Sequence, residues 1–96
     1  LEQRLAVRHT LKPLDVLDTG EMLLHRLRIG GYTGEQHLFT PDAIYEIHRA
    51  SNGTPRLASQ LADNALLMGM AQSAKLIDGY LMHTVIDAFN GKEEAA

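Results

Sequence analysis

Apolar residues return every three or four positions along most of the chain, which is the spacing of one face of an α-helix. Glycine, proline and asparagine interrupt this pattern at a few points and divide it into four stretches. The pattern therefore predicts four helices with short connections, over residues 15–30, 41–51, 55–72 and 78–89. In the first connection, Leu38 and Phe39 are expected to pack back onto the core.

The ends of these stretches carry residues that are typical of helix caps. Asp15 and Asp78 are suited to accept hydrogen bonds from the first N–H groups of the first and last helices. Thr40 and Thr54 each precede a proline, and a hydroxyl residue followed by proline at the first helical position is a strong start signal. Asn52-Gly53 suits the left-handed conformation that commonly ends a helix. These signals support the predicted boundaries.

Residues 4–11 alternate between apolar and polar positions, which predicts a short β-strand that Pro13 ends. A single strand cannot satisfy its own backbone hydrogen bonds, so it is either a frayed arm or the last strand of a sheet formed by preceding residues. We favour the second alternative. The predicted fold class is mainly α: a four-helix domain over residues 14–90, preceded by a strand or arm at residues 1–13 and followed by a polar tail at residues 91–96.

Composition narrows the range of functions. The formal net charge is −3 and the pI about 5.9, which gives no general support for a nucleic-acid or membrane partner, although a local basic patch stays open. No apolar run approaches about 18 residues, so no membrane insertion is expected in this segment. The absence of cysteine excludes a disulfide framework and thiol catalysis. Because the chain begins with Leu1, we expect it to be a segment of a longer protein.

Candidate chemistry within the chain is sparse. Five histidines raise the question of a metal site: His9, His25, His37, His48 and His83. No two of them are four residues apart and no carboxylate recurs beside them, so no metal site is expected. The sequence also lacks a serine nucleophile elbow and a glycine-rich phosphate loop. The chain alone is therefore expected to lack a complete active site.

Arg56 stands out because of its position. It falls in the first turn of the predicted helix 55–72, where unpaired N–H groups and the helix dipole favour anions. A cation there is unfavourable by some tenths of a kcal/mol, yet its donors beside the positive helix end would suit a bound phosphate. The alternative to a phosphate-binding arginine is one that simply points into solvent. The position of Arg56, taken by itself, favours this alternative.

The stretch GTPRLASQLADNALL, which begins at Gly53, resembles the sensor 2 motif of AAA+ ATPases, in which Gly-x-x-Arg opens the third helix of a small helical lid. The pattern of the whole chain is similar to a lid preceded by the last strand of an ATPase core. Within this group it resembles most the ExeA/GspA-like ATPases of general secretion and pilus assembly, including MshM-type proteins, and more weakly TniB/TnsC transposition ATPases and RuvB. Ser59 departs from the asparagine usual in that family.

The resemblance implies roles for several residues. Arg56 would be the sensor 2 arginine that reaches the γ-phosphate of ATP, and Gly53, Thr54 and Pro55 would accompany it at the nucleotide. Arg4 lies where related motors carry an arginine finger that reaches a neighbouring subunit.

The resemblance also implies partners. ATP and Mg²⁺ would be bound mainly by an upstream ATPase core, with Walker A and Walker B motifs that this chain lacks. The partners would be that core, neighbouring subunits of an oligomer, and a secretion or pilus-assembly protein. A cytoplasmic location follows, with the inner face of the membrane as one option.

Two alternatives remain open. One is a DNA-binding or adaptor domain of a transposition-type ATPase, because several basic residues could gather on one face despite the acidic total. These residues are His9, Lys12, Arg26, Arg28, His48, Arg49 and Arg56. The other is a helical domain whose family resemblance is accidental. Salt-dependent binding to duplex DNA would favour the first of these alternatives.

Overall fold

A computed structural model describes residues 13–95, with side chains as far as Gly91. It contains four helices: α2 (Val16–Ile29), α3 (Pro41–Ser51), α4 (Pro55–Ala71) and α5 (Gly79–Ala95). No β-strand occurs between residues 13 and 95. The predicted fold class, a small four-helix domain, is confirmed for this range. The strand predicted at residues 4–11 lies outside the described residues.

The predicted helix starts are correct to within one residue, and side chains explain three of them. The carboxylate of Asp15 accepts a hydrogen bond from the Asp18 N–H at 2.8 Å, and that of Asp78 accepts one from the Leu81 N–H at 2.9 Å. The Thr40 hydroxyl accepts one from the Ala43 N–H at 3.3 Å. These bonds satisfy N–H groups that have no partner inside their helices.

The end of α5 differs from the prediction. The helix was expected to end at Phe89, and it continues to Ala95. Asn90-Gly91 resembles a helix C-cap in the sequence and opens the stretch that was expected to be a polar tail. The residues that follow, Lys92 to Ala95, have high helix propensity, and one glycine inside a helix costs only about 1 kcal/mol. Propensity therefore outweighs the stop signal.

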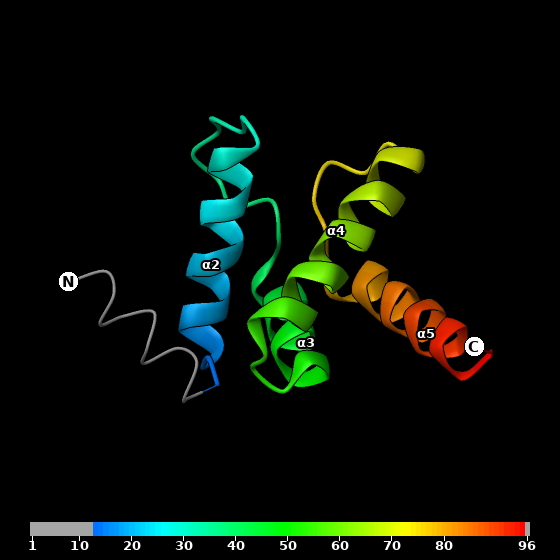
Figure 1. Ribbon diagram of the computed structural model, residues 1–96. Coiled ribbons are helices and arrows are strands. Elements are labelled where there is room, and N and C mark those ends of the chain that lie inside the picture. The colour runs from blue at the N-terminus through cyan, green and yellow to red at the C-terminus, as the bar shows by residue number, and fades with distance from the viewer. Residues whose placement is uncertain (1–12, 96) are drawn as a thin grey trace.

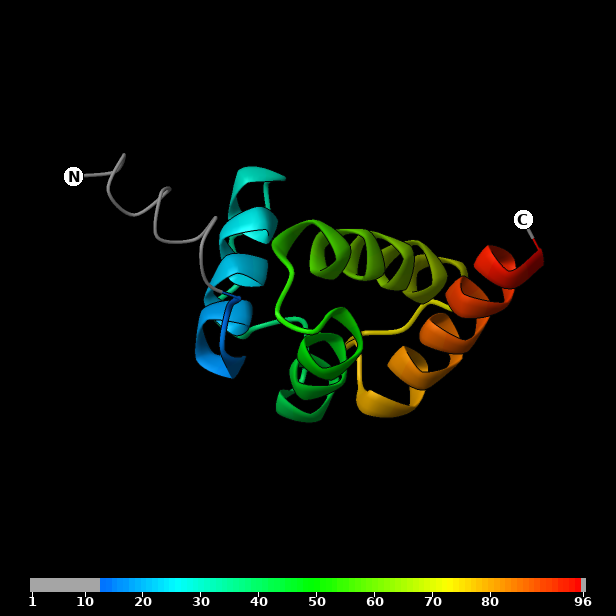
Figure 2. The same cartoon turned by 60° about the horizontal axis from the view of Figure 1, so that its bottom comes forward.

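The helices α3 and α4 lie at the centre of the molecule, with α2 on one side and α5 on the other (Figure 1). Each central helix contacts both outer helices, whereas α2 and α5 do not contact each other within residues 13–95. The view turned by 60° shows the same order (Figure 2). The positions of α2 and α5 relative to each other are therefore set by α3, α4 and the loops.

The two longer loops are joined across the middle of the domain. The Ile77 N–H donates to the Leu38 carbonyl at 2.8 Å, and the Thr40 N–H donates to the Ile77 carbonyl at 2.9 Å. This isolated parallel bridge holds Phe39 and Ile77 in the core, where 1% and 4% of their surfaces are exposed. The expectation that Phe39 packs back onto the core is confirmed, and Leu38 is half-buried beside it.

The core is formed by one stripe from each helix together with the bridged loops. Its buried members are Leu23, Leu27, Phe39, Ala43, Ile47, Ala58, Leu61, Ala62, Ala65, Ile77, Leu81, Met82, Val85 and Ile86. Small residues on α4, above all Ala58 and Ala65, allow its neighbours to approach closely. This packing fixes the turn between α3 and α4 on which the candidate site lies.

Candidate functional site

The turn between α3 and α4 consists of three residues, Asn52, Gly53 and Thr54. Asn52 is left-handed with φ 57° and ψ 30°, and Gly53 follows with φ 75°. The N–H of Thr54 then donates to the Ser51 carbonyl at 3.0 Å. Two successive residues with positive φ reverse the chain in very little space. The predicted left-handed cap at Asn52-Gly53 is therefore confirmed.

Gly53 is also needed because another segment lies against it. The N–H of Leu14 donates to the Gly53 carbonyl at 2.8 Å. A Cβ atom on Gly53 would lie 2.5 Å from the Leu14 carbonyl oxygen and 2.8 Å from the Cβ of Pro13. Such distances are below van der Waals contact, so only glycine allows Pro13 and Leu14 to cross the turn here.

His48 holds the same segment through a second contact. Its Nε2 lies 3.1 Å from the Leu14 carbonyl oxygen, which can only accept, so the imidazole carries a proton on Nε2. His48 is half-buried in the last turn of α3. The backbone of Leu14 is thus held at its N–H by Gly53 and at its carbonyl by His48. We call this arrangement the Leu14 clamp.

The N-terminus of α4 differs from those of the other three helices. Thr54 occupies the N-cap position, but its side chain accepts no hydrogen bond, and the first turn, like that of α5, contains no acidic residue. The start of α4 at Pro55 agrees with the prediction, but capping by the Thr54 hydroxyl does not occur. The first N–H groups of this helix therefore lack the side-chain acceptor that Asp15, Thr40 and Asp78 provide elsewhere.

Arg56 lies in this first turn and is exposed. Within residues 13–91 it forms no hydrogen bond or ion pair. Arg49 provides a contrast, because its guanidinium donates to the Glu46 carboxylate at 2.6 Å and 3.3 Å, which raises the pKa of Arg49 above its usual value. The structure thus brings an exposed guanidinium and uncapped N–H groups together at the start of α4.

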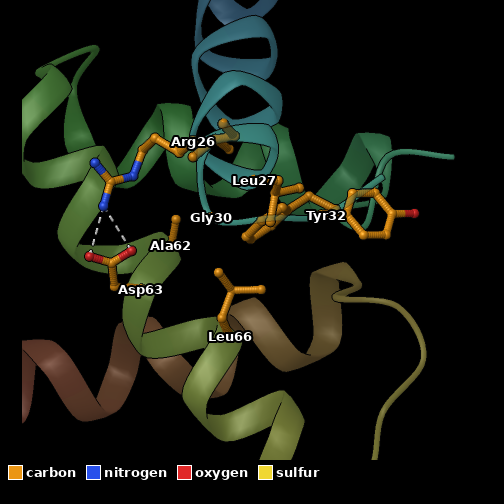
Figure 3. Close-up of a pocket in the computed structure, with 9 residues that line it drawn as sticks. Arg26, Leu27, Gly30, Tyr32, Ala62, Asp63 and Leu66 are labelled. Carbon is orange, nitrogen blue, oxygen red and sulfur yellow. Dashed lines mark hydrogen bonds and ion pairs between the residues drawn. The ribbon is translucent and has the colours of Figure 1, made fainter. Parts of the chain in front are cut away.

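An apolar hollow of about 360 Å³ lies between α2 and α4, separate from Arg56. Figure 3 shows Arg26 and Asp63 facing each other across its edge, where the guanidinium donates to both carboxylate oxygens at 3.0 Å. Its lining residues are Leu23, Arg26, Leu27, Gly30, Tyr32, Phe39, Ala62, Asp63 and Leu66. Arg56 precedes Asp63 by two helical turns, about 10 Å along α4.

The basic residues that a nucleic-acid interface would use are partly committed to other contacts. Arg26 is paired with Asp63 and Arg49 with Glu46. Arg28 donates to the Tyr32 and Gly34 carbonyls and so holds the loop that follows α2. The remaining members of that set are His48, in the Leu14 clamp, and Arg56, while His9 and Lys12 lie outside the described residues.

The histidines have separate structural surroundings. The Nδ1 of His37 accepts from the Phe39 N–H at 3.2 Å, so its Nε2 donates to the Gly20 carbonyl at 3.0 Å. His25 and His83 are exposed, and the Nε2 of His83 lies 3.6 Å from the Glu46 carboxylate. Among the residues that the structure describes, no three metal-ligating side chains come together.

No described helix is both long enough and apolar enough to cross a membrane.

The residues predicted for the site are contiguous: Gly53 and Thr54 lie in the turn, and Pro55 and Arg56 lie in the first turn of α4. Arg4 lies outside the described residues, and its assignment stays a prediction. Sequence reasoning missed Leu14 and His48, which hold the turn from outside. The only sequence signal was Pro13 at the end of the incoming segment, and it does not reveal what that segment contacts.

These features define the class of the molecule: a small all-α domain that presents an exposed arginine in the first turn of α4. No protein-family model matches the chain, and no solved structure matches it. The chain is similar to "General secretion pathway protein A" of Aeromonas hydrophila, with 38% identity over 80 residues.

The similarity is partial. It covers 82% of this chain but only 14% of the length of the Aeromonas protein. Less than a fifth of this chain lies outside the match. The matched stretch therefore includes α3, α4 and the turn between them, whichever end of the chain is unmatched. The chain is thus partially homologous to a general secretion pathway protein and corresponds to a small part of it.

Proposed function

We propose that this domain is the lid of an AAA+ ATPase and that Arg56 is its sensor 2 arginine. In this proposal Arg56 reaches the γ-phosphate of ATP held by a P-loop domain that precedes the lid in the same protein. One observation carries the proposal: Arg56 is exposed in the uncapped first turn of α4, inside a stretch similar to a general secretion pathway protein.

The chemistry of the turn supports a phosphate ligand. The first N–H groups of α4 point out of the helix and carry the positive end of its dipole. Arg56 adds a charged donor group at the same place, against its own electrostatic preference. An anion brought to this turn would relieve that repulsion and accept hydrogen bonds from the helix and from the guanidinium.

The proposal assigns the remaining parts to residues outside this chain. The 96 residues contain no Gly-x-x-x-x-Gly-Lys loop, so Mg²⁺ and most of the nucleotide would be held by the P-loop domain. The domain described here would stabilise charge on the γ-phosphate and move when hydrolysis removes it. Gly53, Thr54 and Pro55 would lie beside the nucleotide.

We further propose that such an ATPase works in the cytoplasm, as an oligomer, on a secretion, pilus or cell-envelope assembly process. The support is the name of the Aeromonas relative, which places that protein in the general secretion pathway.

The experiment is the substitution Arg56→Ala in the complete protein that carries this domain. ATP turnover should fall on the order of a hundredfold, as when one preorganised donor to a transition-state charge is removed. The unfolding of the isolated 96-residue chain should change little, because Arg56 is exposed. Steady-state turnover and thermal unfolding measure the two effects.

Arg49→Ala is the matched control. This substitution also removes a guanidinium, but from the neighbouring helix α3. Because the Arg49 guanidinium is already paired with Glu46, turnover should stay within about twofold. Unchanged turnover in Arg56→Ala would refute the sensor role. The absence of a Gly-x-x-x-x-Gly-Lys-Thr/Ser loop in the residues that precede this segment in the complete protein would refute the lid assignment.

A further inference from the structure

We propose that His48 is a positioning residue: through the Leu14 clamp it fixes Arg56 relative to the part of the protein that precedes residue 13. This inference rests on the proposed function, because it concerns how a phosphate held by a preceding domain meets Arg56. It concerns a residue with no contact to that phosphate, which acts only through the backbone of Leu14 and the turn at Gly53.

The clamp fixes both the position and the direction of the incoming chain. Both backbone polar groups of Leu14 are used, the N–H by Gly53 at 2.8 Å and the carbonyl by His48 at 3.1 Å. The Leu14 side chain is buried, with 6% of its surface exposed. The two hydrogen bonds hold the two peptide groups that flank the Leu14 Cα, and together with the buried side chain they fix the orientation of this residue.

The connection from the clamp to Arg56 is short and stiff. Only Thr54 and Pro55 separate Gly53 from Arg56. The ring of Pro55 fixes its own φ, and the Thr54 carbonyl accepts the Ala58 N–H at 2.9 Å as the first bond of α4. A displacement of Leu14 must therefore either open the clamp or carry the start of α4 with it.

His48 suits this role because its side chain offers an N–H donor that reaches the Leu14 carbonyl. Both the neutral imidazole with its proton on Nε2 and the imidazolium donate to the Leu14 carbonyl. The neighbouring Arg49 is paired with Glu46 instead and does not contact Leu14. Loss of His48 would leave the buried Leu14 carbonyl without the partner that the structure gives it.

The hydrogen bond is tested on the 96-residue chain by NMR. The imidazole spectrum should show a proton on Nε2 of His48 at neutral pH. In His48→Leu, exchange of the Leu14 amide with solvent should accelerate about fivefold, the factor that corresponds to one net hydrogen bond of about 1 kcal/mol. His48→Gln retains an N–H donor and should restore slow exchange.

His25→Leu is the matched control, because His25 is exposed on α2 and should leave the Leu14 amide unaffected. A proton on Nδ1 alone, or exchange of Leu14 that is the same in His48→Leu and the natural chain, would overturn the clamp. If His48→Leu does not fold, the tautomer of the natural chain and His48→Gln still decide.

The positioning role is tested by a double-mutant cycle in the complete protein. His48→Leu should lower kcat for ATP about tenfold and change KM by less than about twofold, because the nucleotide is held by the other domain. In the Arg56→Ala background the same substitution should have an effect within about twofold, since a residue that acts only through Arg56 has nothing left to position.

The cycle separates the two hypotheses. If Arg56→Ala does not lower turnover, the proposed function fails. If Arg56→Ala lowers turnover and His48→Leu either has no effect or multiplies the loss independently, the sensor role stands and the positioning role fails. Recovery of kcat in His48→Gln, together with non-additivity, is the result that we expect.

Discussion

At the scale of single residues, Gly53 meets two demands at once. Its φ of 75° is a conformation that L side chains rarely adopt, and Leu14 lies where a Cβ would be. Either demand alone would favour glycine. Gly31 has the first demand without the second, because its φ is 106° and nothing lies within 4 Å of the added Cβ position.

We predict that Gly53→Ala lowers the free energy of unfolding by about 2–4 kcal/mol, from left-handed strain and from the clash with Leu14. Gly31→Ala should cost only the strain, about 1–2 kcal/mol. Urea unfolding of both variants measures the difference. Equal losses in the two variants would show that Pro13 and Leu14 do not press on the turn.

The local features of the turn could be predicted from the sequence, and its long-range contacts could not. Asn52-Gly53 and Thr54-Pro55 carry their own backbone preferences, so the reversal and the start of α4 follow from neighbouring residues. The bond from His48 to Leu14 joins residues 34 positions apart. Gly53 already had a sufficient local explanation as a helix cap, which concealed its second role.

At the scale of elements, the starts of α3 and α5 meet. The Asp42 carboxylate accepts from the Thr40 hydroxyl at 2.6 Å and lies so close to Gly79 that an added Cβ would be 2.7 Å from its Oδ2. The hydrogen bond from Thr40, assisted by backbone N–H groups that include that of Gly79, lowers the pKa of Asp42 below its usual value of 3.8. A charged Asp42 therefore stabilises this junction.

We predict a pH dependence of stability that arises at Asp42. Because its pKa is lower in the folded state, the stabilisation is fully present above pH 3.8 and is lost as the pH falls through the folded-state pKa. Asp42→Asn should be less stable than the natural chain at pH 7, and the difference should shrink below pH 4. Urea unfolding at a series of pH values measures it.

Asp87→Asn is the control for this series. Asp87 is exposed on α5 and has no hydrogen-bond partner within residues 13–91. Its substitution should leave the shape of the pH profile unchanged. A difference between Asp42→Asn and the natural chain that stays constant from pH 7 to pH 2 would contradict the role of the ionised carboxylate.

Helix existence and helix starts were predictable because caps are local. Each capping side chain accepts a hydrogen bond from an N–H group only three residues further along the chain, so the cap can be recognised from neighbouring residues. These side chains belong to Asp15, Thr40 and Asp78. The partner of Arg26 was not predictable, because Arg26 bonds to Asp63 on α4, 37 positions along the chain. Which helix faces Arg26 is a property of the packed domain.

At the scale of the whole molecule, the bridge between Phe39 and Ile77 unites the two loops. It joins the connection after α2 to the connection after α4, so both loops and their helices form one core. The fold class followed from helical periodicity. The arrangement of α2 and α5 on opposite sides of the central pair did not, because every helix offers a similar apolar stripe.

We predict that Phe39→Ala costs about 3–5 kcal/mol of unfolding free energy, the range for a fully buried aromatic residue. The other phenylalanine of the chain, Phe89, is half-buried on α5, and Phe89→Ala should cost about 1–2 kcal/mol. Thermal unfolding followed by circular dichroism measures both.

If Phe39→Ala is too unstable to fold, Phe39→Leu preserves most of the buried volume and should still lose about 1 kcal/mol. Similar losses at Phe39 and Phe89 would show that the bridged loops contribute no more to the core than a half-buried position of α5. A single cooperative transition is expected for every variant, because one core serves all four helices.

The Leu14 clamp has a mechanical consequence. Tension applied to the chain ahead of Pro13 reaches Leu14 before it reaches Asp15 and α2. At Leu14 the two hydrogen bonds divert part of the load into the turn at Gly53 and into the last turn of α3. A pull on the domain is therefore shared between α2, which continues the chain, and the turn at Gly53, three residues before Arg56.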